Sequence, residues 1–248
     1  LLPSDLIGTD IYRHEKGEFE FRAGPLFHNI LLADEINRAP AKVQSALLEA
    51  MGECQVTLGL KTYPMPKLFM VLATQNPIEQ EGTYNLPEAQ LDRFLMHVRV
   101  DYPDHEDELA ILELDSSRML AKPETPAEAL PQSELFKVRE DVARIYLDTK
   151  LNKYIVDLVQ ASRKPEAYEE GLKRWCRFGA SPRATIALAR CARARAWLDG
   201  EAFVAPHHIH AVAPDVLRHR ILLTFEAEAE GITSDEYIRQ LMEVVAIP

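Results

Sequence analysis

Two adjacent carboxylates, Asp34 and Glu35, follow the apolar run from Leu26 to Ala33. Such a near-continuous run predicts a strand of a parallel sheet that is covered on both faces. Ligands of open α/β sheets bind beyond the carboxyl ends of the strands, where these two side chains could hold Mg²⁺ and polarise a water molecule. Adjacent acids at a strand end also occur in solvated turns and helix caps, so the pair alone leaves both interpretations open.

A second apolar run, from Leu68 to Thr74, is followed by Gln75, Asn76 and Pro77. If both runs are parallel strands of one sheet, Asn76 reaches the same sheet edge as the two carboxylates. Its amide could orient a nucleophilic water or contact a terminal phosphate. The alternative is an ordinary Asn-Pro turn.

Arg93 stands where a short helix, Pro87–Asp92, is expected to lead into a third strand, Phe94–Val100. Most surface arginines have no special role. A guanidinium that is fixed at such a corner can, however, neutralise charge on a transferring phosphoryl group.

The elements expected before Pro103 alternate between strands and helices. A helix is predicted from Pro40 to Met51, with Gly52 able to end it. Two hairpins are also predicted, and their arms are Asp10–Arg13 with Glu18–Arg22, and Gln55–Leu58 with Leu60–Tyr63. Phe19 and Phe21 share one face of the first hairpin, where they could grip another protein or pack against their own.

Strand signals fade after Pro103, where we place a domain boundary. Residues 1–102 are therefore expected to form an α/β domain and residues 103–248 a helical one. The predicted helices of the second domain are Glu106–Arg118, Glu140–Arg163, Arg183–Leu198, Pro206–Thr224 and Ser234–Val245. The predicted helix Pro206–Thr224 begins with three histidines close together, His207, His208 and His210. Because His208 and His210 do not share a helix face, a metal site is disfavoured.

The composition is that of a globular protein, with 47% hydrophobic and 27% charged residues among 248. The longest stretch without an acidic or basic residue, 202–214, is 13 residues long. A membrane span needs roughly 18–20. The N-terminus lacks the pattern of a secretory signal, and three cysteines without CxxC spacing are typical of a reducing cytoplasm.

The formal net charge is −11, which argues against non-specific binding to nucleic acid or to anionic membranes. The charge is unevenly distributed, because seven basic residues and no acidic one lie between Gly171 and Leu198. This stretch could form a solvated helix face or a surface that faces phosphate.

Five motifs in this order together resemble those of a MoxR-type AAA+ ATPase. They are Asp-Glu at 34–35, Ala-Thr-Gln-Asn-Pro at 73–77, Leu-Pro-Glu-Ala-Gln-Leu-Asp-Arg-Phe at 86–94, Gly-Ala-Ser-Pro-Arg-Ala at 179–184 and Val-Leu-Arg-His-Arg-Ile at 216–221. The resemblance implies an α/β fold, in which a P-loop-type parallel sheet core with β-hairpin insertions is followed by an all-α lid domain.

The resemblance also implies roles for particular residues. Asp34 and Glu35 correspond to the Walker B pair, with Asp34 holding Mg²⁺ and Glu35 polarising the attacking water. Asn76 corresponds to sensor 1, Arg93 to the arginine finger and Arg183 to sensor 2. The resemblance leaves open whether Arg183 acts on its own subunit's nucleotide or on a neighbour's.

No G-x-x-x-x-G-K-[ST] sequence occurs in the chain. The resemblance places this phosphate-binding loop before Leu1, so the core is expected to be incomplete at its N-terminus. Because backbone N–H groups of that loop normally supply the anion site, these 248 residues by themselves are expected to bind ATP–Mg²⁺ weakly and to be inactive.

The implied function is ATP hydrolysis, with ATP and Mg²⁺ as cofactors, coupled to chaperone-like remodelling or maturation of partner proteins in the cytoplasm. The family implies a hexameric ring and partners with von Willebrand factor A domains. One alternative is a scaffold that binds partners without using ATP. Another is a carboxylate–metal hydrolase built on Asp34 and Glu35, in which Arg93 would have no evident use.

Overall fold

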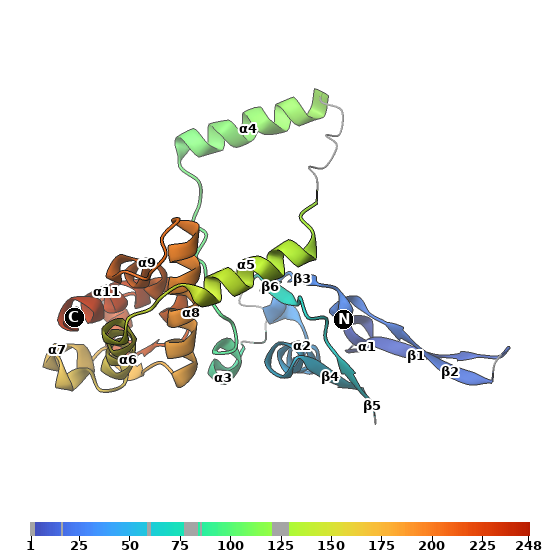
Figure 1. Ribbon diagram of the computed structural model, residues 1–248, viewed down its shortest axis with the longest axis horizontal. Coiled ribbons are helices and arrows are strands. Elements are labelled where there is room, and N and C mark those ends of the chain that lie inside the picture. Colours follow the sequence, from blue (N-terminus) through green and yellow to red (C-terminus); the bar gives the residue numbers. More distant parts are fainter. Residues whose placement is uncertain (1–2, 16, 59–60, 77–83, 85, 121–128) are drawn as a thin grey trace. The chain divides into compact units, whose positions relative to one another are not determined.

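The computed structural model describes residues 3–15, 17–58, 61–76, 84, 86–120 and 129–248 (Figure 1). The chain forms two compact units, Leu1–Phe94 and Leu95–Pro248, whereas the sequence placed a boundary between 102 and 103. Among the described helices, none combines the length and the apolar character that crossing a membrane requires.

The first unit is built on two parallel strands, β3 (Ile30–Ala33) and β6 (Met70–Ala73), which confirms the predicted parallel pairing. β3 is shorter than its apolar run because η1 (Pro25–Phe27) precedes it. Alternate residues of both strands pack against a core that includes Leu26 and Leu47. The opposite face, formed by Ile30, Leu32, Met70 and Leu72, is 45–63% exposed, so the described residues cover only one face of this pair.

The core of this unit is completed by α2 (Ala41–Glu53), which buries Val43, Leu47, Leu48 and Ala50. The helix does not end at Gly52 as predicted. It ends at Cys54, which has a left-handed conformation (φ 52°) and whose N–H bonds the Ala50 carbonyl at 3.1 Å. Gly52 instead leaves room for the Arg93 guanidinium, because a Cβ there would lie 2.3 Å from its Nη1 and the side chain would have to shift.

Both predicted hairpins are present. α1 (Pro3–Ile7) leads into β1 (Gly8–Arg13) and β2 (Glu18–Ala23), and the second hairpin pairs β4 (Gln55–Leu58) with β5 (Lys61–Pro64). Phe21 stacks on Tyr63 with ring centroids 4.2 Å apart and fixes β2 to the rest of the unit. Phe19 stays 68% exposed opposite Tyr12, so the two phenylalanines of one face have different surroundings.

The short helix predicted before Arg93 is confirmed as α3 (Glu88–Leu91). The third strand predicted at Phe94–Val100 is wrong, because this segment joins no described ladder. A strand needs a neighbour for its backbone groups, and here the His97 N–H donates to the Asp215 carbonyl of the second unit at 2.8 Å.

The second unit is mainly helical, and its largest buried side chains, such as Tyr154, Leu188 and Tyr237, belong to one core. Small buried residues on α8 and α9, including Ala184, Ala192 and Ala213, allow these helices to pack closely (Figure 1). The elements of this unit are α4 (His105–Leu120), α5 (Gln132–Arg144), α6 (Thr149–Arg163), η3 (Pro165–Ala167), α7 (Glu170–Lys173), β7 (Cys176–Phe178), α8 (Pro182–Leu198), α9 (Pro206–Leu217), β8 (Leu222–Leu223), α10 (Phe225–Ala229) and α11 (Ser234–Val244).

Two predicted helices of this unit are wrong in extent. The range Glu140–Arg163 holds the end of α5 and all of α6, separated where Tyr146 exchanges backbone bonds with Ala202 and Val204. The range Pro206–Thr224 holds α9 and then the short strand β8, which pairs with β7. In both places long-range backbone pairing replaces local helical bonds.

The N-terminus of α9 depends on a histidine. His208 is fully buried, and its Nδ1 accepts a hydrogen bond from the Ala205 N–H at 2.9 Å. Because Nδ1 acts as an acceptor, the proton of the neutral ring lies on Nε2. A second proton on Nδ1 would break this capping bond.

We therefore predict that acidification destabilises the second unit. Burial, followed by nearby His207, lowers the pKa of His208 below 6.5, against the opposing effects of Glu201 and Asp199. The contribution of the neutral His208 ring to the free energy of unfolding is fully present above pH 6.5. It is lost as the pH falls through the lowered pKa of the folded state. Thermal unfolding followed by circular dichroism between pH 7.5 and 5 should show this loss.

His208→Gln should reduce this pH dependence and cost about 1 kcal/mol at neutral pH, the usual worth of a capping bond. Burial also lowers the pKa of His97 and His210, so some pH dependence should remain. An exposed histidine of the same unit provides the control variant, His105→Gln in α4. An unchanged pH profile in His208→Gln would contradict the assignment.

Candidate active site

Asp34 and Glu35 lie directly after β3, as the sequence predicted, and the backbone turns sharply between them and η2 (Ile36–Arg38). Glu35 has φ 49° and ψ 51°, a left-handed conformation that costs a residue other than glycine about 1–2 kcal/mol. The turn is held by the neighbouring strand, because the Ile36 N–H bonds the Thr74 carbonyl at 3.0 Å. Both carboxylates therefore stay at the carboxyl edge of the strand pair.

Thr74 joins the two acids through its side chain. Its hydroxyl donates to Oδ1 of Asp34 at 2.5 Å and accepts the Glu35 N–H at 2.9 Å. Thr74 belongs to the motif at 73–77, but no role was predicted for it. The strand register indicates this contact. Ala33 pairs with Ala73, and the next residues along the two strands are Asp34 and Thr74.

Arg38 is a second residue that the sequence analysis missed. Its Nη1 lies 2.9 Å from Oε2 of Glu35, in an i,i+3 ion pair near the surface. Such exposed pairs contribute at most about 1 kcal/mol, so the bond places the Glu35 carboxylate without locking it.

Asn76 follows β6 two residues after Thr74 and is half-buried. It thus comes from the strand that also carries Thr74, at the edge where Asp34 and Glu35 lie. The groups placed at this edge that could bind a metal ion are the carboxylates of Asp34 and Glu35 and the hydroxyl of Thr74, all of which offer hard oxygen ligands. Mg²⁺ prefers such donors and retains several waters, which suits an exposed Asp34 whose Oδ2 remains beside the bonded Oδ1.

Arg93 follows α3, and its guanidinium contacts α2 of the same unit. Nη1 donates to the Leu48 carbonyl at 2.7 Å and lies over Gly52. A cation is favoured here because the carbonyls near the C-terminus of a helix carry partial negative charge. The structure therefore gives Arg93 a bond within its own chain.

Arg183 lies in the other compact unit, in the first turn of α8, where it is exposed. Ser181 caps this helix by accepting the Arg183 N–H at 3.1 Å. Several members of the basic stretch are engaged within the unit, since Arg195 pairs with Asp199 and Arg193 donates to the Ile145 carbonyl. Arg195 is exposed, as a solvated helix face predicts, whereas Arg193 is half-buried and contacts the backbone of the unit.

The histidines near the start of α9 do not form a suitable metal centre. Ligand atoms of Asp199, His207 and His208 lie within 4.8 Å of one another. The bond from the Ala205 N–H to Nδ1 of His208 leaves the proton on Nε2, which therefore lacks the lone pair that a metal needs. His210 instead pairs with the Tyr154 hydroxyl at 2.7 Å.

Comparisons with known proteins agree with this geometry. Residues 1–96 match a family model described as "ATPase family associated with various cellular activities (AAA)", and residues 173–241 match one described as an AAA lid domain. A protein from Cytophaga hutchinsonii, described with its crystal structure as a candidate ATPase, superposes with a TM-score of 0.91 and 47% identity, covering 100% of this chain and 75% of that one.

Three of the curated relatives carry the name MoxR. Chaperone MoxR1 of Mycobacterium tuberculosis is 47% identical over all of this chain, which spans 65% of that protein's length. Protein MoxR of Paracoccus denitrificans is 33% identical over 94% of this chain and 73% of its own length.

We predict that Thr74→Val loosens the turn at Glu35 while retaining the strand. Valine has the shape of threonine but removes the hydroxyl, so the Glu35 amide should exchange with solvent faster, at a cost of about 1 kcal/mol in unfolding free energy. Hydrogen–deuterium exchange of a peptide that includes Glu35 measures this. Thr74→Ser should restore protection.

The matched control is Thr62→Val in β5, whose hydroxyl faces Thr57 at 3.4 Å on an exposed hairpin. It should leave the exchange of Glu35 unchanged. Equal protection of Glu35 in Thr74→Val and in the unmodified protein would show that the hydroxyl does not hold the turn.

Proposed function

Because the chain belongs to the MoxR-type AAA+ ATPases, we propose that it contributes to binding ATP with Mg²⁺ and to hydrolysing ATP, together with a phosphate-binding loop that these 248 residues do not contain, to remodel or mature partner proteins. The observation that supports this most is the bonding of Asp34 and Glu35 to Thr74 at the carboxyl edge of β3 and β6. Phosphoryl transfer depends mainly on positioning and electrostatic stabilisation, and fixed carboxylates at this edge suit that chemistry.

In this proposal Asp34 and Glu35 are the Walker B pair. Bound Mg²⁺ supplies positive charge that stabilises the phosphates. Asp34 would hold the ion through its waters, while its bond to Thr74 fixes the carboxylate plane. Glu35 would accept a proton from the attacking water, on Oε1 while Arg38 pairs with Oε2, or on either oxygen once that pair opens. Asn76, as sensor 1, would orient that water.

Arg93 is proposed to act as an arginine finger on the nucleotide of a neighbouring subunit. To do so, its guanidinium must leave the Leu48 carbonyl of its own chain. Arg183, as sensor 2 on the helical lid, would approach a nucleotide as the lid closes. A finger acting between subunits requires a ring, and we propose a hexamer.

The helical part, 103–248 in the sequence analysis, is proposed to be the lid of the α/β core. We further propose partners that carry von Willebrand factor A domains, as the family implies. A cytoplasmic location is supported by the three cysteines, all of which are free.

The first test is Glu35→Gln in the intact protein. The amide keeps the shape of the carboxylate but cannot take a proton, so ATP binding should persist while hydrolysis slows roughly 10²–10⁴-fold. Isothermal titration and phosphate release measure the two quantities. Glu53→Gln, at the exposed end of α2, is the control. Turnover within about twofold of the unmodified protein would exclude Glu35 as the base, and partner remodelling without any ATP dependence would favour the scaffold alternative.

The second test is Arg93→Ala. Nucleotide affinity should change little, whereas hydrolysis should fall roughly 10²-fold or more, since the finger acts on the transition state. Mixing Arg93→Ala with Glu35→Gln subunits should restore some activity, because an intact site then meets an intact finger. Arg13→Ala, which removes a surface pair with Glu20, is the control. If no mixing ratio restores turnover, Arg93 does not act between subunits.

A further inference from the structure

The segment that follows Arg93 is fixed to the helical unit by its backbone. The His97 N–H donates to the Asp215 carbonyl at 2.8 Å, and Nη1 of Arg220 donates to the Leu95 carbonyl at 3.2 Å. Met96 packs against the core of the same unit. Residues 95–97, which we call the connector, therefore belong to the helical unit although they directly follow the α/β one.

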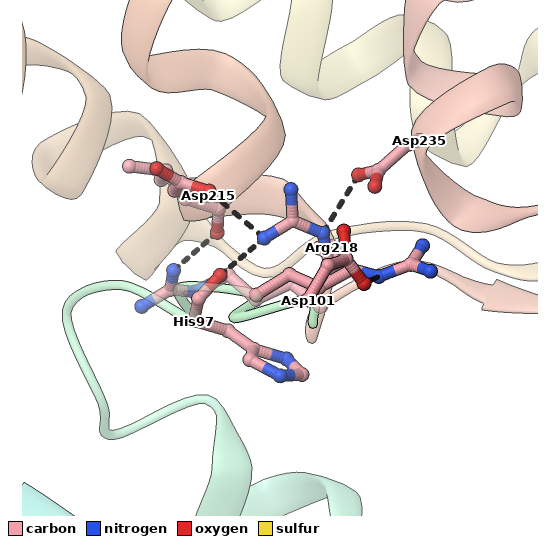
Figure 2. A network of polar contacts seen from close by, with 8 residues as sticks. His97, Asp101, Asp215, Arg218 and Asp235 are labelled. Carbon is pink, nitrogen blue, oxygen red and sulfur yellow. Dashed lines mark hydrogen bonds and ion pairs between the residues drawn. The ribbon is translucent and has the colours of Figure 1, made fainter. Parts of the chain in front are cut away.

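Arg218 is the centre of this attachment (Figure 2). Its Nε donates to Oδ1 of Asp235 at 2.7 Å, and its Nη1 donates to Oδ1 of Asp215 at 2.8 Å and to the His97 carbonyl. Asp215 lies on α9 and Asp235 on α11, so one guanidinium joins two lid helices to the connector. The side chain is only 14% exposed, which strengthens its charge-assisted bonds.

On the other side of the junction, Arg93 is bonded to the α/β unit through the Leu48 carbonyl. Only Phe94 separates Arg93 from the first residue of the connector. Two peptide steps span at most about 7 Å, so the backbone between the two attachments has little slack. Phe94 is therefore the only residue between them whose backbone rotation could absorb a movement of the connector before that movement reaches Arg93.

We propose that Arg218 is a positioning residue for Arg93: by holding the connector on α9 and α11, it makes the orientation of the lid determine whether Arg93 reaches a neighbouring subunit's nucleotide. The inference rests on the proposed role of Arg93 as a finger. It extends that role, because it identifies how the state of the lid is passed to the finger.

The chemistry at this place requires arginine. Two different nitrogens of one planar group bind acceptors on separate elements, which the single ammonium of lysine cannot do in the same geometry. If Arg218 only stabilised the lid, its removal would impair every function of the subunit. If it positions Arg93, removal should impair donation of the finger and spare the subunit's own catalytic carboxylates.

Mixed rings of the intact protein separate these cases. Rings of Arg218→Ala subunits alone should hydrolyse ATP at least 10-fold more slowly than unmodified rings. Mixing them with Glu35→Gln subunits, which carry an intact finger, should restore turnover as it does for Arg93→Ala. Mixing them with Arg93→Ala subunits should restore nothing, because neither subunit donates a working finger.

The outcomes distinguish this inference from the proposed function. If Arg93→Ala is rescued by Glu35→Gln and Arg218→Ala is not, Arg218 has no positioning role and the inference is wrong while the proposed function stands. If neither is rescued, the finger does not act between subunits and both fail. Full activity of Arg218→Ala rings would also overturn the inference.

A structural measurement accompanies the kinetic one. Hydrogen–deuterium exchange of the His97 amide should become faster in Arg218→Ala and stay unchanged in the matched control Arg239→Ala. Arg239 also lies on α11 and pairs with Glu236 and Glu243, but it is 54% exposed and makes no bond to the connector in the described contacts. Unchanged exchange of His97 in Arg218→Ala would contradict the proposal.

Asp235→Asn is the milder variant if Arg218→Ala does not fold, as thermal unfolding would show. It retains an oxygen acceptor for Nε and removes the charge, so it should give smaller changes of the same kind in the exchange of His97 and in rescue by Glu35→Gln. Arg218→Lys should resemble Arg218→Ala, and restoration of both readouts by lysine would overturn the argument from geometry.

Discussion

The parallel pairing of β3 with β6 is the constraint on which the candidate active site depends. Continuing its register by one residue places Thr74 beside Asp34, where one hydroxyl can bond both the carboxylate and the next amide. That bonding holds Glu35 in a left-handed conformation that it would not adopt alone. The geometry of the two acids is thus a consequence of strand register, and the strain at Glu35 is offset by bonds from the neighbouring strand.

A second constraint acts on the junction between the two compact units. Backbone groups beyond Arg93 must find partners, and those of Leu95 and His97 find them on α9 and on the segment just after it rather than in the sheet. Arg218 adds charged bonds to this attachment. The two arginines on either side of the junction therefore attach adjacent stretches of chain to different units. Under our proposal, these two attachments allow the orientation of the lid to affect the position of Arg93.

Contacts between residues that are distant in sequence explain where predictions from local sequence patterns failed. The periodic pattern across Glu140–Arg163 is helical, yet the chain breaks where Tyr146 pairs with the segment around Val204. Likewise Gly52, a conventional helix terminator, lies inside α2, where the guanidinium of Arg93 packs over it. In each case a residue distant in sequence decided the local structure, and a local pattern carries no information about that residue.

The sequence by itself determined the two hairpins, the parallel character of two strands, the carboxylates that follow the first of them, and the family. These features depend on local composition and on motif order, which a single chain displays directly. Only the tertiary structure revealed the contacts of Thr74, Arg38 and Arg218, and only it showed that Phe94–Val100 is no strand. Thr74 bonds a residue 40 positions away and Arg218 one more than 100 positions away, and these bonds exist only after the chain has folded.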